Sequence, residues 1–225
     1  MANLMEELLQ ALTAEGITLL YGPAGAGKSL LCLLAVLMNQ NRQGKIFFID
    51  CQSSSFPHER LEQLCKDKAL IRELKERIFF IHPKNLREQV RILEKLATVK
   101  KVIAAVIVDN ITYLYRLEKG GYGKSGKSYR TSKQLIDHVE SLAALGEELH
   151  IPIILSSHIY SMPKKENASS EAYRLIGGKI LEQQAKRTIV FFDRGSSRML
   201  RIIDTASGKK LQHSFRIIDS GIEEA

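Results

Sequence analysis

Residues 22–29 combine glycines, a lysine and a hydroxyl side chain in the spacing Gly22-x4-Gly27-Lys28-Ser29. This is the spacing of a phosphate-binding loop (P-loop), in which main-chain N–H groups surround phosphate oxygens at the start of a helix. In such loops the lysine contacts the β- and γ-phosphates, and the hydroxyl that follows it binds Mg²⁺. The pattern therefore predicts a site for ATP and Mg²⁺, with ATP bound by Gly22, Pro23, Ala24, Gly25, Ala26, Gly27, Lys28 and Ser29.

A P-loop site also needs a carboxylate at the end of a neighbouring buried strand, where it holds Mg²⁺ through the water shell of the ion. Asp109 directly follows the seven apolar residues 102–108. An aspartate at the end of a buried strand can equally cap a turn. Together with the P-loop, however, this one predicts that Ser29 and Asp109 hold the metal.

ATP hydrolysis needs a further group that orients or deprotonates the attacking water. Asp50 and Gln52 follow a strand-like run at residues 45–50. They would therefore lie at the carboxyl end of the sheet, where ligands of open α/β sheets bind. Asp50 can equally be a structural turn residue and Gln52 a surface amide, and the residues alone leave both interpretations open.

Strand-like and helix-like runs alternate along most of the chain, which predicts an α/β fold with a mostly parallel, twisted sheet and helices on both faces. The expected strands are 17–22, 45–50, 77–81, 101–109 and 151–157, and the expected helices are 28–40, 57–67, 86–97 and 130–149. Three further strand-length runs within 187–221 are joined by Gly/Ser turns and predict a C-terminal antiparallel extension. We expect a single domain over residues 1–225, with a short N-terminal helix in 1–15 and no separate N-terminal DNA-binding domain.

The composition is that of a globular protein: of 225 residues, 44% are hydrophobic and 26% charged. The formal net charge of +8 favours a polyanionic partner. No apolar run approaches the roughly 18 residues that a membrane span needs, and the N-terminus does not resemble a signal peptide. Because the three cysteines form no C-x-x-C pair, neither a disulfide framework nor a cysteine-rich zinc site is expected. We expect a cytoplasmic protein with no membrane partner.

Two long tracts, 116–129 and 160–174, fit no regular element and are rich in cations. In the first tract Tyr122 and Tyr129 lie among the basic residues. Cations can follow a phosphate backbone while aromatic rings stack on unpaired bases, so the pattern is typical of single-stranded DNA binding. A solvated basic loop would have the same composition. The residues expected to bind DNA are Lys119, Lys124, Lys127, Arg130, Lys164, Lys165 and Arg174.

The succession of these motifs resembles the RecA/RadA recombinases, and most closely the archaeal RadB paralogues, which consist of the recombinase core alone. The resemblance covers about residues 16–223 and rests on "YGPAGAGKS", "FFIDCQSSSFPHERL", "VIAAVIVDN", "IPIILSSHIYS", "LIGGKILEQQAKRTIVFF" and "FRIIDSGIE" in this order. It implies a RecA-like P-loop ATPase core and DNA binding through two loops. It also implies an accessory role in homologous recombination and DNA repair, with single-stranded or branched DNA and a RadA-type recombinase as partners.

Two positions depart from the recombinase pattern. In the recombinases a Thr-Glu pair follows the aspartate that matches Asp50, and the glutamate is the base for water; here the pair is Cys51-Gln52. The strand-end Asn-Gln that senses the γ-phosphate matches Ser157-His158. His158 can donate a hydrogen bond to phosphate, or it is only a polar strand end. Gln52 and His158 thus stand at the catalytic positions. Because Gln52 is not a base, we expect ATP binding with weak or absent hydrolysis.

The resemblance leaves two other functions open. One is a KaiC-like signalling ATPase that does not bind DNA, and the other is a non-hydrolysing ATP-binding scaffold for a recombinase. Homo-oligomers fit the family, but the short N-terminal segment contains no evident polymerisation motif, so we expect no long filament. Arg187 and Arg194 are candidates for an arginine that acts on the γ-phosphate, and both also fit surface strand ends.

Overall fold

The computed structural model describes residues 3–52, 55–118, 125–160, 174–175 and 179–225. These residues form one mixed sheet with the strand order β10-β9-β8-β7-β1-β5-β4-β2-β3, and β6 pairs with β5. The strands are β1 (Gly16–Gly22), β2 (Lys45–Asp50), β3 (Ile78–Ile81), β4 (Ile103–Asp109), β5 (Pro152–Tyr160), β6 (Arg174–Leu175), β7 (Ala185–Arg194), β8 (Ser197–Asp204), β9 (Lys210–Ile218) and β10 (Gly221–Glu224).

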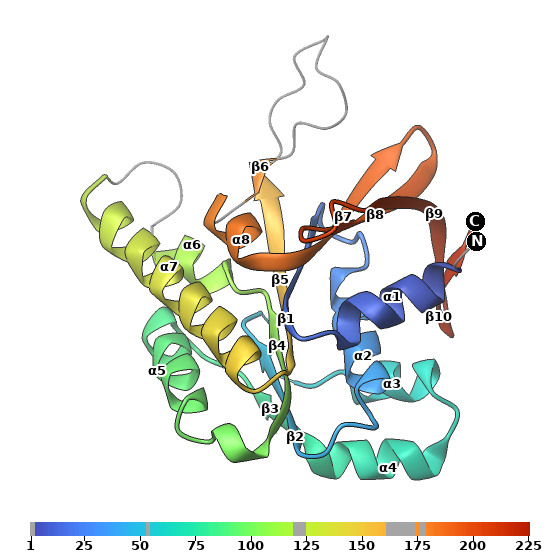
Figure 1. Cartoon of the computed structure of the whole chain (residues 1–225), viewed down its shortest axis with the longest axis horizontal. Coiled ribbons are helices and arrows are strands. Elements are labelled where there is room, and N and C mark those ends of the chain that lie inside the picture. Colours follow the sequence, from blue (N-terminus) through green and yellow to red (C-terminus); the bar gives the residue numbers. More distant parts are fainter. Residues whose placement is uncertain (1–2, 53–54, 119–124, 161–173, 176–178) are drawn as a thin grey trace.

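Helices cover both faces of the sheet (Figure 1). They are α1 (Leu4–Thr13), α2 (Lys28–Met38), α3 (His58–Leu64), α4 (Lys68–Arg77), α5 (Leu86–Leu96), α6 (Tyr113–Glu118), α7 (Ser125–Glu148) and α8 (Lys179–Gln184), with a 3₁₀ turn η1 (Lys100–Val102). Helices α1 to α4 contribute to one buried apolar cluster and α5 to α8 to a second one on the opposite face. None of the helices in the described residues is long and apolar enough to cross a bilayer.

The strands β3, β2, β4, β5, β1 and β7 pair in parallel, whereas β8, β9 and β10 continue the sheet from β7 by antiparallel pairing. Every residue of β4 is buried, as expected for a strand that helices cover on both faces. The predicted α/β fold, with a mostly parallel sheet and a C-terminal antiparallel extension, is therefore confirmed.

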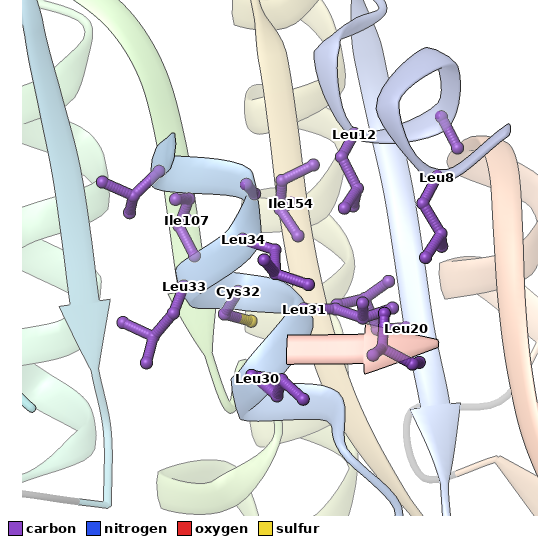
Figure 2. Close-up of a cluster of buried hydrophobic side chains, with 14 of the residues drawn as sticks. Leu8, Leu12, Leu20, Leu30, Leu31, Cys32, Leu33, Leu34, Ile107 and Ile154 are labelled. Carbon is purple, nitrogen blue, oxygen red and sulfur yellow. The ribbon is translucent and has the colours of Figure 1, made fainter. Parts of the chain in front are cut away.

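Helix α2 is buried along nearly its whole length, which explains its continuous apolar sequence. Figure 2 shows its leucines and Cys32 in one cluster with Leu8 and Leu12 of α1 and with Leu20, Ile107 and Ile154 of the sheet. Burying such side chains contributes about 1.5–3 kcal/mol each. This packing fixes the start of α2, and with it the P-loop that precedes the helix.

The structure differs from the expected elements in three places. The tract 116–129 is partly helical, because α6 ends at Glu118 and α7 begins at Ser125. Helix α4 was not expected, since its charged sequence buries only Ile71 and Leu74 against the sheet. Strand β5 also continues to Tyr160, beyond its expected end.

Strand β7 and the antiparallel extension pack directly against the P-loop. A Cβ atom at Gly22 would lie 2.7 Å from both the Cβ and the carbonyl oxygen of Phe191 in β7. A Cβ atom at Gly27 would lie 3.2 Å from Ile217 Cδ1 in β9. The loop therefore needs glycine at position 22 for space, because the backbone of β7 cannot move away.

We predict that Gly22→Ala destabilises the protein more than Gly25→Ala. Both glycines have positive φ (154° and 72°), but no atom lies within 4 Å of a Cβ at Gly25. Gly25→Ala should lower the free energy of unfolding by about 1–2 kcal/mol, because of its backbone conformation alone. Gly22→Ala should lower it by ~1–3 kcal/mol more than Gly25→Ala, because the added Cβ overpacks against β7. Urea denaturation without nucleotide measures both values. Equal losses would contradict the packing described for Gly22.

Candidate nucleotide-binding site

Four parallel strands bring the predicted site residues to one edge of the sheet. Gly22 at the end of β1 lies opposite His158 of β5, and Asp50 at the end of β2 lies opposite Asp109 of β4. Because β5 lies between β1 and β4, the end of β5 separates the P-loop from Asp109. The sheet order thus brings the P-loop, the expected metal ligand and the expected sensor residue together at one edge.

The P-loop presents open backbone at the N-terminus of α2. Gly27 adopts the left-handed conformation (φ 107°) immediately before the helix, and Ala24, Gly25 and Ser29 are exposed. No side chain would meet a Cβ at Gly25. Phosphate oxygens can therefore approach the main-chain N–H groups, where the partial positive charge of the helix end favours an anion.

Lys28 lies inside the loop and is only 6% exposed. Its Nζ donates hydrogen bonds to the carbonyl oxygens of Gly22 (2.9 Å) and Pro23 (2.5 Å). Burial lowers the pKa of the Lys28 ammonium group, and the nearby carboxylate of Asp109 partly offsets this effect. The loop backbone thus positions the amino group on the side of the site where Asp109 lies.

Asp109 is 8% exposed, and one of its carboxylate oxygens is held by a neighbouring strand. The Ser156 hydroxyl of β5 donates a hydrogen bond to Asp109 Oδ1. The backbone N–H of Cys51 donates to the Asp109 carbonyl oxygen at 2.7 Å. No described residue donates a hydrogen bond to Oδ2, so this oxygen can accept one from a metal-bound water.

These residues fit Mg²⁺-ATP. The exposed hydroxyl of Ser29 and the buried carboxylate of Asp109 are the oxygen donors that Mg²⁺ prefers, and Lys28 and the loop backbone suit phosphate. Nowhere in the described ranges do three His, Cys, Asp or Glu side chains form a cluster that could hold a metal. The ion would therefore take its remaining ligands from phosphate and water, as Mg²⁺ usually does.

Gln52 and His158 are in contact, although 106 residues separate them in the chain. Gln52 Nε2 and His158 Nε2 are 3.1 Å apart. With the amide nitrogen as donor, His158 accepts at Nε2 and carries its proton on Nδ1. Burial lowers the pKa of His158, and the positive charges of Lys28 and Arg116 lower it further. The imidazole is therefore neutral at pH 7.

Asp50 holds the turn that positions Gln52. Its Oδ1 accepts a hydrogen bond from the backbone N–H of Gln52 at 2.8 Å, and its carbonyl oxygen lies 2.9 Å from His82 Nδ1. Of the two interpretations of Asp50, these contacts favour the structural one. The amide of Gln52 is exposed at the same edge as the P-loop.

Three residues that the sequence did not single out, Asn110, Thr112 and Ser156, help to link β4 to β5. Asn110 Oδ1 accepts hydrogen bonds from the backbone N–H (3.0 Å) and hydroxyl (2.8 Å) of Thr112, and the Thr112 hydroxyl lies 3.0 Å from Ser157 Oγ. Together with the bond from Ser156 to Asp109, these contacts tie the turn after Asp109 to the strand that carries His158. In the sequence, the signal that could have identified these residues is the run of polar residues at the carboxyl end of each apolar strand.

The residues expected to bind DNA are only partly described. Lys127 and Arg130 lie in the first turns of α7, and Arg174 lies in β6, where only the backbone is described. The other four, Lys119, Lys124, Lys164 and Lys165, lie outside the described residues. DNA contact by all seven stays a prediction.

A buried hydrogen bond joins α6 and α7, the helices on either side of residues 119–124. The Tyr115 hydroxyl of α6 bonds to His138 Nδ1 of α7, and both side chains are less than 10% exposed. Burial lowers the pKa of His138, so the ring remains neutral in this contact at pH 7. Residues 119–124 are thus flanked by two helices that are fixed to each other.

Of the two arginines considered for the γ-phosphate, Arg187 lies at the wrong end of the sheet. It pairs with Thr18 near the start of β1, and its guanidinium donates to the Glu15 carbonyl oxygen at 2.7 and 3.1 Å. Arg194 is exposed at the carboxyl end of β7.

Comparison with known proteins identifies the family. The model of the Rad51 family matches residues 2–225, almost the whole chain. The chain belongs to the Rad51 family. The predicted RecA/RadA-type recombinase core is confirmed, and so is the resemblance to RadB, because several RadB proteins match this Rad51-family chain.

Most of the RadB relatives match over nearly the whole length of both chains. The "DNA repair and recombination protein RadB" of Methanocaldococcus jannaschii is 26% identical over 98% of this chain and 99% of its own. The RadB of Methanococcoides burtonii is 29% identical over 82% of this chain and 78% of its own. The "DNA repair and recombination protein RadA" of Aeropyrum pernix is 25% identical over 99% of this chain but only 71% of its own. This Rad51-family chain thus corresponds in extent to RadB.

We predict that Ser156→Ala raises the Mg²⁺ concentration needed for tight binding of a fluorescent ATP analogue about tenfold or more, since ligand-orienting partners typically contribute this much. The Ser156 hydroxyl is fully buried and orients the Asp109 carboxylate. Binding in EDTA should not change. Thr18→Val is the matched control, because the equally buried Thr18 hydroxyl donates to the Ala11 carbonyl oxygen near the start of β1, away from the P-loop. Identical Mg²⁺ titrations for the wild type and Ser156→Ala would overturn this role.

Proposed function

We propose that this Rad51-family protein binds Mg²⁺-ATP and DNA and acts as an accessory protein in homologous recombination and DNA repair. The family and the printed function of its RadB and RadA relatives support a role in recombination and repair. The observation that carries the finer proposal is the contact between Gln52 and His158 beside the P-loop. It joins the group expected to face the attacking water to the group expected to sense the γ-phosphate.

In the proposed complex, phosphate oxygens replace the two loop carbonyls that now accept hydrogen bonds from Lys28. Ser29 and Asp109 hold Mg²⁺, which neutralises phosphate charge. Residues 22–27 contribute main-chain N–H groups. His158, opposite Gly22, then donates a hydrogen bond to the γ-phosphate from a ring nitrogen.

We propose that hydrolysis is weak or absent. The Gln52 amide cannot accept a proton at neutral pH, and loss of a general base typically costs about 10²–10⁴ in rate. The amide nitrogen of Gln52 also donates a hydrogen bond to His158, so it is not available to orient the attacking water. This contact gives specific support to a second candidate function, a non-hydrolysing ATP-binding scaffold for a RadA-type recombinase.

The strand that carries His158 supports coupling between nucleotide and DNA. Strand β5 runs on to Tyr160, and its last residues pair with β6, so that Ile159 lies opposite Leu175 and Tyr160 opposite Arg174. Both ends of the second basic tract are therefore attached directly behind the proposed sensor. We propose that the γ-phosphate changes the order of this tract through His158, which couples ATP to DNA binding.

The proposal also covers domain organisation, location, assembly and the kind of DNA that is bound. We propose that the chain works as one domain in the cytoplasm, forms no long filament and binds single-stranded or branched DNA. The tracts containing Lys119, Lys124, Lys164 and Lys165 provide cations for the phosphates. A KaiC-like signalling ATPase would share the nucleotide site but would not bind DNA.

We predict that single-stranded DNA binds with a steep salt dependence and with an affinity that ATP changes at least fivefold relative to ADP. Fluorescence anisotropy of a labelled 40-mer, measured over a range of KCl concentrations with ATP, with ADP and without nucleotide, tests this. The variant Lys28→Ala should lose the difference between nucleotides but keep binding without nucleotide. No binding at low salt in any state would favour the signalling ATPase.

We also predict that Gln52→Glu raises ATP turnover at least tenfold, because a carboxylate restores a proton acceptor at this position. A coupled phosphate-release assay with saturating DNA measures the rate. Gln52→Ala is the control, since it removes the amide without adding a base. If Gln52→Glu turns over no faster than the wild type while it binds nucleotide normally, Gln52 does not face the attacking water.

A further inference from the structure

Helices α3 and α4 form a hairpin with a groove of about 590 Å³ on its surface. The groove is lined by Glu62, Cys65, Lys66, Lys68, Ile71, Arg72 and Lys75. In Figure 1, α4 lies at the bottom of the view and β6 at the top. The groove is therefore remote from the carboxyl edge of the sheet, where the candidate nucleotide site and the described ends of both basic tracts lie.

Cations dominate this groove, which we call the α3–α4 groove. Lys66, Lys68 and Arg72 are exposed, and none of the three forms an ion pair with another described residue. Lys75 pairs with Glu62 at 2.5 Å, so Glu62 is already neutralised. The lining thus contains four cations and one carboxylate, that of Glu62, which also interacts with Lys68, so positive charge is in excess. Two of the cations, Lys68 and Arg72, lie four residues apart on one face of α4.

The other carboxylate close to the groove does not cancel these charges by ion pairing. Asp67, at the start of α4, accepts hydrogen bonds from the backbone N–H groups of Ala69 (2.9 Å) and Leu70 (3.1 Å). It therefore serves as the helix cap.

The apolar part of the groove is formed by two residues, Cys65 and Ile71, together with the aliphatic stems of the surrounding cations. Ile71 is only 5% exposed, and Cys65 is half-buried. Protein segments that dock on grooves usually insert an aromatic or aliphatic side chain into a pocket. Exposed cations around a small apolar floor suit a ligand that is anionic along its length, such as a phosphate backbone.

We propose that the α3–α4 groove binds the phosphate backbone of DNA, as a contact surface separate from the two basic tracts at the carboxyl edge. Contacts of this kind position a protein on DNA without reading its sequence. They also do not depend on nucleotide, because no groove residue belongs to the ATP site. The inference goes beyond the proposed function, which places DNA only at the carboxyl edge.

The hairpin provides a rigid surface for such a contact. The guanidinium of Arg60 in α3 donates to the carbonyl oxygens of Ile218 and Asp219 at 3.0 Å each. Leu61 and Leu74 are fully buried beneath the two helices. Binding therefore requires no ordering of the backbone, and only the long basic side chains lose conformational freedom.

The test compares two triple variants in binding to a fluorescein-labelled 40-base-pair duplex without nucleotide. One variant combines Lys66→Gln, Lys68→Gln and Arg72→Gln. The control combines Arg87→Gln, Arg91→Gln and Lys95→Gln, three exposed cations of α5 that line no part of the groove. Each triple variant lowers the formal net charge of +8 by three.

The groove variant should lose about tenfold in affinity at 100 mM KCl, and the slope of its affinity against salt concentration should fall by between about 2 and 3. The control should bind like the wild type.

Cys65 provides a second readout in the unmodified protein. It is half-buried in the groove, whereas Cys32 and Cys51 are 0% and 1% exposed, so a maleimide should react first at Cys65. Saturating duplex should slow this reaction at least fivefold, with ATP or without it. Mass spectrometry of the labelled peptide confirms the site.

Equal losses of affinity in the two triple variants, or labelling of Cys65 at an unchanged rate on DNA, would overturn the inference. Protection of Cys65 by poly-L-glutamate but not by DNA would also overturn it and assign the groove to an acidic protein segment. These outcomes are separate from failure of the proposed function. That proposal concerns nucleotide-dependent binding of single-stranded DNA, which the groove variant should retain.

Discussion

The register between β1 and β5 is the constraint on which the nucleotide site depends, because it places His158 opposite the first glycine of the P-loop. Side chains alternate between the two faces of a strand, so a slip of one residue would turn His158 and Ser156 to the other face of the sheet. The bond from Ser156 to Asp109 and the contact of Gln52 with His158 depend in addition on the register between β5 and β4, in which Leu155 lies opposite Val108. The expected metal ligand, the expected sensor and the loop are therefore positioned by the two strand pairings of β5.

Packing on both faces of the sheet maintains that pairing. On one face, α2 is enclosed by α1 and the sheet, and Phe191 of β7 and Ile217 of the C-terminal extension pack beneath the P-loop. On the other face, α6 and α7 are joined by the buried pair Tyr115 and His138. The extension is thus part of the support of the nucleotide site, although it lies outside the parallel strands.

Charge is distributed differently in the site and on the surface. In the site, the buried cation Lys28 and the buried anion Asp109 lie close together, and His158 is kept neutral by burial and by nearby cations. This arrangement suits an anionic ligand that brings its own metal ion. In the α3–α4 groove the cations are exposed and in excess, which suits a long polyanion that remains hydrated. The excess of positive charge in the sequence thus has at least one defined location.

The sequence by itself determined the P-loop, because the residues involved are contiguous and their chemistry is local. It also determined the α/β class, through the alternation of apolar runs, and it indicated Asp109, through the buried strand before it. The tertiary structure alone decided that Gln52 touches His158, that Ser156 holds Asp109 and that Arg187 lies at the opposite end of the sheet. These facts depend on strand order and register between segments far apart in the chain, and apolar periodicity reports only which face of each element is buried.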